Sequence, residues 1–142
     1  MPGLQTPARD LADGELECMT RCASAVIVGA AYLLYDMAIA EALEHSIRFP
    51  EQGDSNAIRR LYTRRQVELP RIDAPISHSW VVWTASTWDN WQWLLSKYIT
   101  LQYRYVCRFG RDHAEYLEIR RLINQCPRPR AHGRTPFPEE AC

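Results

Sequence analysis

Three arginines and a histidine near residue 110 have the types and spacing of a phosphate-binding site. Arg104 and Arg108 are four residues apart, so they share one face if this segment is a helix. Arg111 and His113 follow at once, where the sequence predicts the turn into a further helix, and the free N–H groups at a helix start also favour an anion. The competing interpretation is that these cations pair with the neighbouring acids Asp112, Glu115 and Glu118.

A second group of candidate residues lies in the stretch 78–98, which holds all five tryptophans of the chain. His78, Trp80, Trp83 and Asn90 combine stacking surfaces with an imidazole and an amide, and such residues can cradle a nucleobase. The competing interpretation is an ordinary aromatic core with a satisfied histidine, and residue types alone favour that core.

The N-terminus offers chemistry of another kind. Removal of the initiator methionine from Met1–Pro2 would leave Pro2 with a secondary amine, which is a competent Schiff-base nucleophile once it is deprotonated. Many chains begin with Met-Pro without using this amine, so the dipeptide alone does not predict an enzyme.

The cysteines allow a zinc site but do not favour one. Cys18 and Cys22 are one helical turn apart, and with Cys107 and His113 they would supply four ligands. Because no CxxC pair supports such a site, buried thiols are the better interpretation, and we expect no metal and no cofactor. Five cysteines without a secretory signal peptide favour reduced thiols and a cytoplasmic location.

The elements that position these residues are predicted to be helices. Residues 23–40 are apolar enough for a membrane span, but Asp36 and Gly29 interrupt the run, so we expect a buried central helix and no membrane. Asp10 or Asp13 should cap that helix, which should run to about residue 45, and Ser55 should cap a helix over 55–69. Shorter helical turns are expected over 79–85.

The tryptophan-rich stretch continues into a long helix that should end at Gly110. Its start is predicted at a capping box formed by Ser86 with Asp89 or by Thr87 with Asn90. A helical period places one apolar stripe on the core side, namely Trp88, Trp91, Leu94, Leu95, Tyr98, Leu101, Gln102 and Tyr105. Trp93 falls off this stripe, toward Lys97 and Arg104, unless it packs on a neighbouring helix.

A last helix should open at a capping box of Asp112 and Glu115 and run to about Gln125. The predicted fold is therefore all-α: a compact single-domain helical bundle over residues 1–126, built around one long central N-terminal helix. A long Trp-rich second helix and two or three shorter helices complete it. Residues 127–142 are rich in Pro and Arg and lack periodicity, which predicts a disordered tail.

Charge is distributed unevenly along the chain although the formal net charge is zero. Residues 1–55 carry three Arg against nine acids, a net charge of −6, and residues 56–142 carry fourteen basic residues against eight acids, a net charge of +6. Arginine grips phosphates bidentately and stacks on bases, so the second half is the better candidate for a nucleic-acid partner. The cluster Arg59–Arg65 is more simply a solvated helix face.

Three segments together resemble a phage and bacterial pattern. They are His78-Ser-Trp-Val-Val-Trp83, Asn90-Trp-Gln-Trp-Leu94 and Tyr105-Val-Cys-Arg-Phe-Gly-Arg-Asp-His113. The pattern is roughly H-P-x-x-x-W, N-Y-x-W-L and Y-x-x-R-Y-G-K-x-H-K, and proteins that carry it are commonly assigned to the pyrimidine dimer DNA glycosylase (endonuclease V-like) group. Leu11–Leu16 is similar to the entry into that family's central helix.

The resemblance implies a compact all-α protein that binds double-stranded DNA and flips a nucleotide out of the stack. It implies DNA contacts by Arg21, His78, Trp83, Asn90, Arg104, Arg108, Arg111 and His113, and a location in the host cytoplasm for a phage protein. In active members the N-terminal amine attacks the deoxyribose C1′ and a carboxylate assists, so Pro2 would be the amine. The family's glutamate position is occupied here by Cys22, and the nearest carboxylate on the same face is Glu15. The alternatives are a non-catalytic DNA-binding or DNA-modification accessory protein and a small structural protein that kept the fold.

Overall fold

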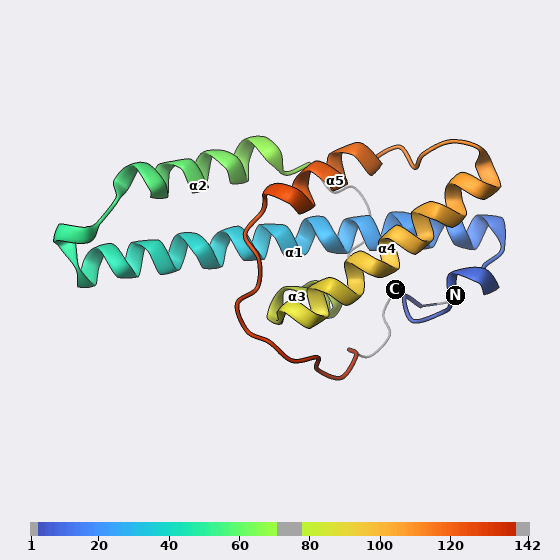
Figure 1. Ribbon diagram of the computed structural model, residues 1–142, viewed down its shortest axis with the longest axis horizontal. Coiled ribbons are helices and arrows are strands. Elements are labelled where there is room, and N and C mark those ends of the chain that lie inside the picture. Colours follow the sequence, from blue (N-terminus) through green and yellow to red (C-terminus); the bar gives the residue numbers. More distant parts are fainter. Residues whose placement is uncertain (1–2, 71–77, 139–142) are drawn as a thin grey trace.

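The computed structural model describes residues 3–70 and 78–138, and this part of the chain is all-α (Figure 1). It contains no strand. The main helices are α1 (Asp13–Arg48), α2 (Ser55–Glu68), α3 (His78–Ser86), α4 (Trp88–Phe109) and α5 (Tyr116–Gln125). Two short 3-10 helices, η1 (Ala8–Asp10) and η2 (Pro50–Gln52), precede α1 and α2. The predicted fold class is confirmed, including the long N-terminal helix at its centre.

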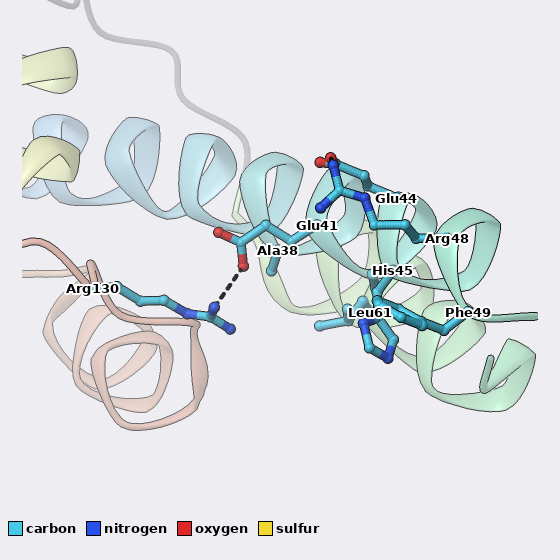
Figure 2. A pocket seen from close by; sticks show the side chains of 9 residues that line it. Ala38, Glu41, Glu44, His45, Arg48, Phe49, Leu61 and Arg130 are labelled. Carbon is cyan, nitrogen blue, oxygen red and sulfur yellow. Dashed lines mark ion pairs between the residues drawn. The ribbon is translucent and has the colours of Figure 1, made fainter. Parts of the chain in front are cut away.

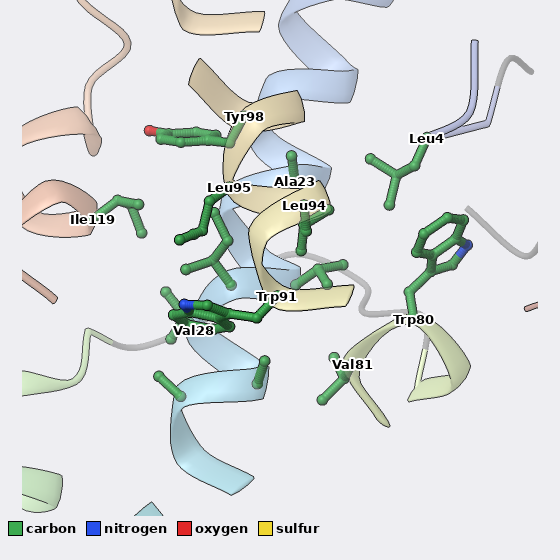
Figure 3. Packing of buried hydrophobic residues seen from close by; sticks show 14 of the residues in the cluster. Leu4, Ala23, Val28, Trp80, Val81, Trp91, Leu94, Leu95, Tyr98 and Ile119 are labelled. Atoms are coloured by element: carbon green, nitrogen blue, oxygen red, sulfur yellow. The ribbon is translucent and has the colours of Figure 1, made fainter. Parts of the chain in front are cut away.

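The core forms where α4 crosses the middle of α1, with α3 and α5 on either side of the crossing (Figures 1 and 3). The predicted stripe of α4 is confirmed as core, since all of it is buried except the half-buried Trp88. Trp91, Leu94 and Tyr98 lie against the small and branched residues of α1 (Figure 3). Gly29 allows α3 to approach α1 closely, because a Cβ added there would lie 2.8 Å from Val81 Cγ2.

Both ends of α4 form as the sequence predicts. Thr87 Oγ1 accepts a hydrogen bond from the Asn90 backbone N–H at 3.1 Å, which is the second of the two predicted starts. Gly110 adopts a left-handed conformation with φ of 70°, and its N–H donates to the Val106 carbonyl at 2.8 Å. Only glycine enters this region without strain, so the residue type determines where the helix stops.

Three other predicted caps are wrong. α1 begins after Ala12, whose N–H donates to Glu15 Oε1 at 2.9 Å, so neither Asp10 nor Asp13 is its N-cap. The N-cap of α2 is Asp54 rather than Ser55, and its carboxylate accepts from the backbone N–H groups of residues 56 and 57.

The predicted capping box of Asp112 and Glu115 does not form at α5, which begins only at Tyr116. Asp112 instead accepts from Gln102 Nε2 at 2.9 Å, and Glu115 accepts from Ser24 Oγ at 3.2 Å. Both acids are therefore used in tertiary contacts, which a local sequence pattern does not reveal.

The second half of α1 and the antiparallel α2 form an arm that extends beyond the other helices (Figure 1). The two helices are joined by Arg65, whose guanidinium bonds Asp36 at 2.6 Å and lies over the Tyr32 ring. Arg59, Arg60 and Arg64 are exposed, as expected for a solvated face. By length and composition α1 would be able to cross a membrane, yet 61% of its most apolar stretch is buried inside the fold.

Residues 127–138, which we call the C-terminal segment, have no regular secondary structure but make defined contacts with other parts of the fold. This segment leaves α5, crosses α1 and runs along α3 and the start of α4 (Figure 1). Arg130 pairs with Glu41 at 3.1 Å, and the Trp88 N–H donates to the Ala131 carbonyl at 2.7 Å. Backbone groups of residues 131, 133 and 135 thus bond to other parts of the fold, since the segment has no helix or strand of its own.

Candidate nucleic-acid interface

The four predicted phosphate-binding residues lie at the C-terminal end of α4 and in the connection to α5. Arg104, Arg108 and Arg111 are exposed, whereas His113 is buried. Arg108 Nε lies 3.3 Å from Asp13 Oδ1, so this guanidinium is held at the start of α1. Within the described residues, neither Arg104 nor Arg111 forms an ion pair. Two of the acids that the sequence offered as partners bond elsewhere, Asp112 to Gln102 and Glu115 to Ser24.

Polar contacts hold the connection between α4 and α5 in place against both long helices. Gln102 of α4 donates to Asp112 and accepts from the His113 backbone N–H at 3.3 Å. Glu115 reaches α1 through Ser24. Arg111 therefore extends from a connection that is held on both sides, and this preorganisation suits it to bind an anion without first ordering a loop.

The side chains beneath this connection form a buried polar cluster. His113 stacks edge-on against Tyr105, with ring centroids 5.4 Å apart, and its Nδ1 has no hydrogen-bond partner among the described residues. Burial lowers the pKa of His113, an effect that the nearby Glu115 opposes and the nearby Arg21 reinforces. The interaction with Arg21 places that exposed α1 arginine close to the same end of α4.

Burial also raises the pKa of Tyr98, and the charge of Glu115 adds to that shift. The Tyr98 hydroxyl is a second buried polar group without a partner in the part of the chain described. A neutral imidazole and a neutral phenol thus lie beneath the arginines. They add no charge to a surface whose exposed cations without an ion-pair partner among the described residues are Arg21, Arg104 and Arg111.

Of the three predicted catalytic residues, Glu15 and Cys22 lie in the part of the chain that the structure describes. Pro2 lies outside the described residues. The Glu15 carboxylate accepts a hydrogen bond from the Ala12 backbone N–H at the start of its own helix. Cys22 is half-buried and packs against the hydrophobic core, as a small apolar side chain does.

The predicted base-binding group is brought together only in part, at the other end of α4. Asn90 and Trp83 are buried and adjacent, since Asn90 Nδ2 donates to the Trp83 carbonyl at 2.8 Å, but His78 is exposed at the start of α3. Trp93 packs on Trp80 and Trp83, with ring centroids 5.9 and 5.7 Å away, which bears out the alternative that it faces a neighbouring helix.

The two groups are far apart along α4. At 1.5 Å per residue, the helix rises roughly 27 Å between Asn90 and Arg108. A phosphate bound at the arginines and a base bound near Asn90 would therefore belong to well-separated nucleotides.

The sequence patterns did not single out Lys97, Thr135 or Phe137, although all three contact residues at or near the candidate sites. Lys97, the single lysine of the chain, is half-buried and donates to the Thr6 carbonyl, and burial lowers its pKa. This contact places a second candidate amine against the N-terminal segment. Thr135 and Phe137 of the C-terminal segment complete the tryptophan cluster, which a sequence interpreted as disordered does not suggest.

A surface pocket of about 560 Å³ lies apart from both groups, on the arm (Figure 2). It is open and lined by Glu41, Glu44, His45 and Arg48, with Leu61 and Phe49 at its apolar side. Its carboxylates are paired, Glu41 with Arg130 and Glu44 with Arg48 at 3.4 Å, and the His45 ring lies 5.2 Å from that of Phe49. It includes none of the residues predicted from the sequence.

No protein-family model, no curated protein and no solved structure matches this chain. The glycosylase resemblance therefore rests on the segments quoted above and remains a hypothesis. In the described residues no group of three His, Cys, Asp or Glu side chains could hold a metal ion.

Proposed function

We propose that this protein binds double-stranded DNA through the surface formed by Arg21, Arg104 and Arg111. The observation that carries the proposal is that these guanidiniums are exposed at one end of α4 and have no ion-pair partner within the described residues. Such groups gain most from phosphates, because no internal salt bridge has to be broken first. The glycosylase resemblance supports the same partner.

The test is the salt dependence of duplex binding, measured by fluorescence anisotropy between 50 and 200 mM salt. Three phosphate contacts give a slope of log K against log salt of about −2.7, which is roughly a 40-fold loss of affinity over this range. Arg104→Gln or Arg111→Gln should each reduce the size of the slope by about 0.9. The matched control is Arg59→Gln, an exposed arginine on the arm. An unchanged slope for both variants, or an equal change for the control, contradicts the proposal.

A glycosylase or lyase reaction is the sharper form of this function. In it, an amine of the protein attacks the deoxyribose C1′, the bond from C1′ to the base breaks and the base leaves, or water leaves at an abasic site. The sugar ring opens to give an imine, which borohydride reduces to a stable adduct. Peptide mapping of a trapped adduct on abasic or dimer-containing duplex distinguishes Pro2 from Lys97. Absence of any adduct, with salt-dependent binding retained, leaves DNA binding and removes catalysis.

The alternative is a non-catalytic DNA-binding module, and a specific observation favours it. Glu15 caps its own helix, Cys22 packs in the core, and Asn90 and Trp83 already bond to Thr135. If only the family carboxylate is missing, Cys22→Glu should create or raise cleavage. A Cys22→Glu protein that folds and binds DNA but still forms no adduct favours the module.

A further inference from the structure

The C-terminal segment lies on the rest of the protein in the way that a bound peptide lies on its receptor. The receptor surface is the group of Trp80, Trp83, Asn90 and Trp93, which we call the tryptophan cage. The segment has no regular secondary structure, residues 131–136 are exposed, and only Phe137 inserts among the cage rings. Phe137 packs against the hydrophobic core, and defined polar contacts hold the exposed residues before it.

The start of α4 recognises the backbone of the segment. The Trp88 N–H donates to the Ala131 carbonyl at 2.7 Å, and Asp89 Oδ2 accepts from the Gly133 N–H at 2.5 Å. Both contacts are available because the first turn of a helix leaves its N–H groups free and favours a carboxylate. They fix the direction and register of whatever extended chain lies here.

Asn90 and Trp83 together bind Thr135 at three atoms. Its Oδ1 accepts from the Thr135 N–H at 3.1 Å, and its Nδ2 donates to the Thr135 hydroxyl at 2.9 Å. Trp83 Nε1 donates to the Thr135 carbonyl at 3.2 Å. Asn90 is fully buried, so these bonds are selective: a ligand without the matching donor and acceptors leaves a buried amide unsatisfied.

Phe137 fills the space between the three indoles. Its ring centroid lies 4.7 Å from that of Trp93, 5.3 Å from that of Trp83 and 5.8 Å from that of Trp80. Arg134 lies over the Phe137 ring at 4.6 Å and over Trp93 at 5.8 Å. The chain bends at Gly133, whose φ is 103°, and beyond it Thr135 and Phe137 are alternate residues that both face the cage, which is how peptide-binding surfaces obtain specificity from one face of an extended chain.

From these contacts we infer that the tryptophan cage is a recognition site for an extended peptide of a partner protein, with the sequence Arg-Thr-x-aromatic, and that the C-terminal segment is its resident competitor. The segment is displaceable because residues 131–136 are exposed and have no regular secondary structure, which are properties of a region that opens locally. The partner's peptide would supply the same carbonyl, N–H, hydroxyl and ring. This inference does not depend on DNA binding, which uses the other end of α4.

The test uses the full chain and a labelled octapeptide, Ala-His-Gly-Arg-Thr-Pro-Phe-Pro, in fluorescence anisotropy. A tethered competitor acts at an effective concentration on the order of millimolar, so the wild type should bind the peptide weakly. Phe137→Ala weakens the competitor and should raise affinity at least tenfold. Phe49→Ala, which alters a half-exposed phenylalanine on the arm, is the matched control and should leave affinity unchanged.

Changes in the peptide test the cage without altering the protein fold. Replacing the peptide's Thr by Val or its Phe by Ala should each weaken binding at least tenfold, to the wild type and to Phe137→Ala alike. Equal binding of these peptides, or no peptide binding to a folded Phe137→Ala chain, overturns the inference. An eight-nucleotide single strand that gains more from Phe137→Ala than the peptide does would assign the cage to bases instead, and would also overturn it.

Discussion

Gly29 is the position where the packing of α3 on α1 can be tested with a single methyl group. A Cβ added at Gly29 would meet Val81 Cγ2 at 2.8 Å and Cγ1 at 3.3 Å, and Val81 is buried and stiff at χ1. Forcing a methyl into such a site typically costs about 1–3 kcal/mol. Replacing a mid-helix glycine by alanine gains about 1 kcal/mol in helix propensity. Gly29→Ala should therefore lower the free energy of unfolding by about 1 kcal/mol.

The sign should reverse once Val81 is shortened. Val81→Ala removes both offending methyl groups, and the nearest remaining atom of that side chain is its Cβ, 3.7 Å from the added methyl, which is ordinary contact. In that background Gly29→Ala should stabilise by up to about 1 kcal/mol. The coupling energy between the two sites is then about 2 kcal/mol, within the range for residues in direct contact.

Urea unfolding at 25 °C, followed by far-UV circular dichroism, measures the four corners of this cycle. The control is Gly14→Ala at the start of α1, where an added Cβ meets nothing within 4 Å, so no packing cost is expected. A Gly29→Ala protein that is more stable than the wild type, or a coupling energy below about 0.5 kcal/mol, would refute the proposed approach of α3 to α1.

Two further predictions concern the polar contacts that the structure assigns. Because burial lowers the pKa of His113, the unfolded chain binds more protons at this site, so its contribution to stability should be lost as pH falls below about 6.5. His113→Gln should reduce the loss of urea stability between pH 7.5 and 5.5, and an identical pH dependence in the two proteins would contradict the assignment. At the start of α2, Asp54→Ala should cost about 1 kcal/mol, whereas Ser55→Ala should change stability by less than about 0.5 kcal/mol in the same assay, since Asp54 makes the cap bonds. Equal effects, or a larger effect at Ser55, would restore the cap predicted from the sequence.

Much of the fold follows from local signals that leave little choice. The stripe along α4 and the glycine at residue 110 fix that helix, because burial and a left-handed backbone each require a particular residue type. The failures at the caps have a different cause. Asp54 and Ser55 are both good N-caps and are adjacent in sequence, so a propensity argument cannot choose between them. Asp112 and Glu115 match a capping box, but the tertiary partners Gln102 and Ser24 use them instead.

For the candidate sites, the sequence predicted the local placement of residues on a helix or in a turn, but it did not predict contacts between distant residues. Spacing on a helix placed Arg104 and Arg108 on one face, and the turn that carries Arg111 follows from Gly110. The contact of Arg108 with Asp13 was not predictable, since it joins residues that are far apart in the chain. Composition alone also does not reveal the contacts of the C-terminal segment with Asn90 and Trp83.

Those contacts show what a proline- and arginine-rich stretch requires in order to pack on the rest of a fold. Such a segment lacks apolar periodicity and cannot satisfy its backbone internally, so its sequence favours disorder unless another element supplies the hydrogen bonds. Here the hydrogen bonds come from Asn90 and Trp83, which the sequence had already singled out, and from the backbone N–H of Trp88. A buried asparagine between tryptophans needs a partner as much as the segment does. The order of the C-terminal segment and the saturation of Asn90 are therefore one effect, so whatever displaces the segment has to satisfy Asn90 as well.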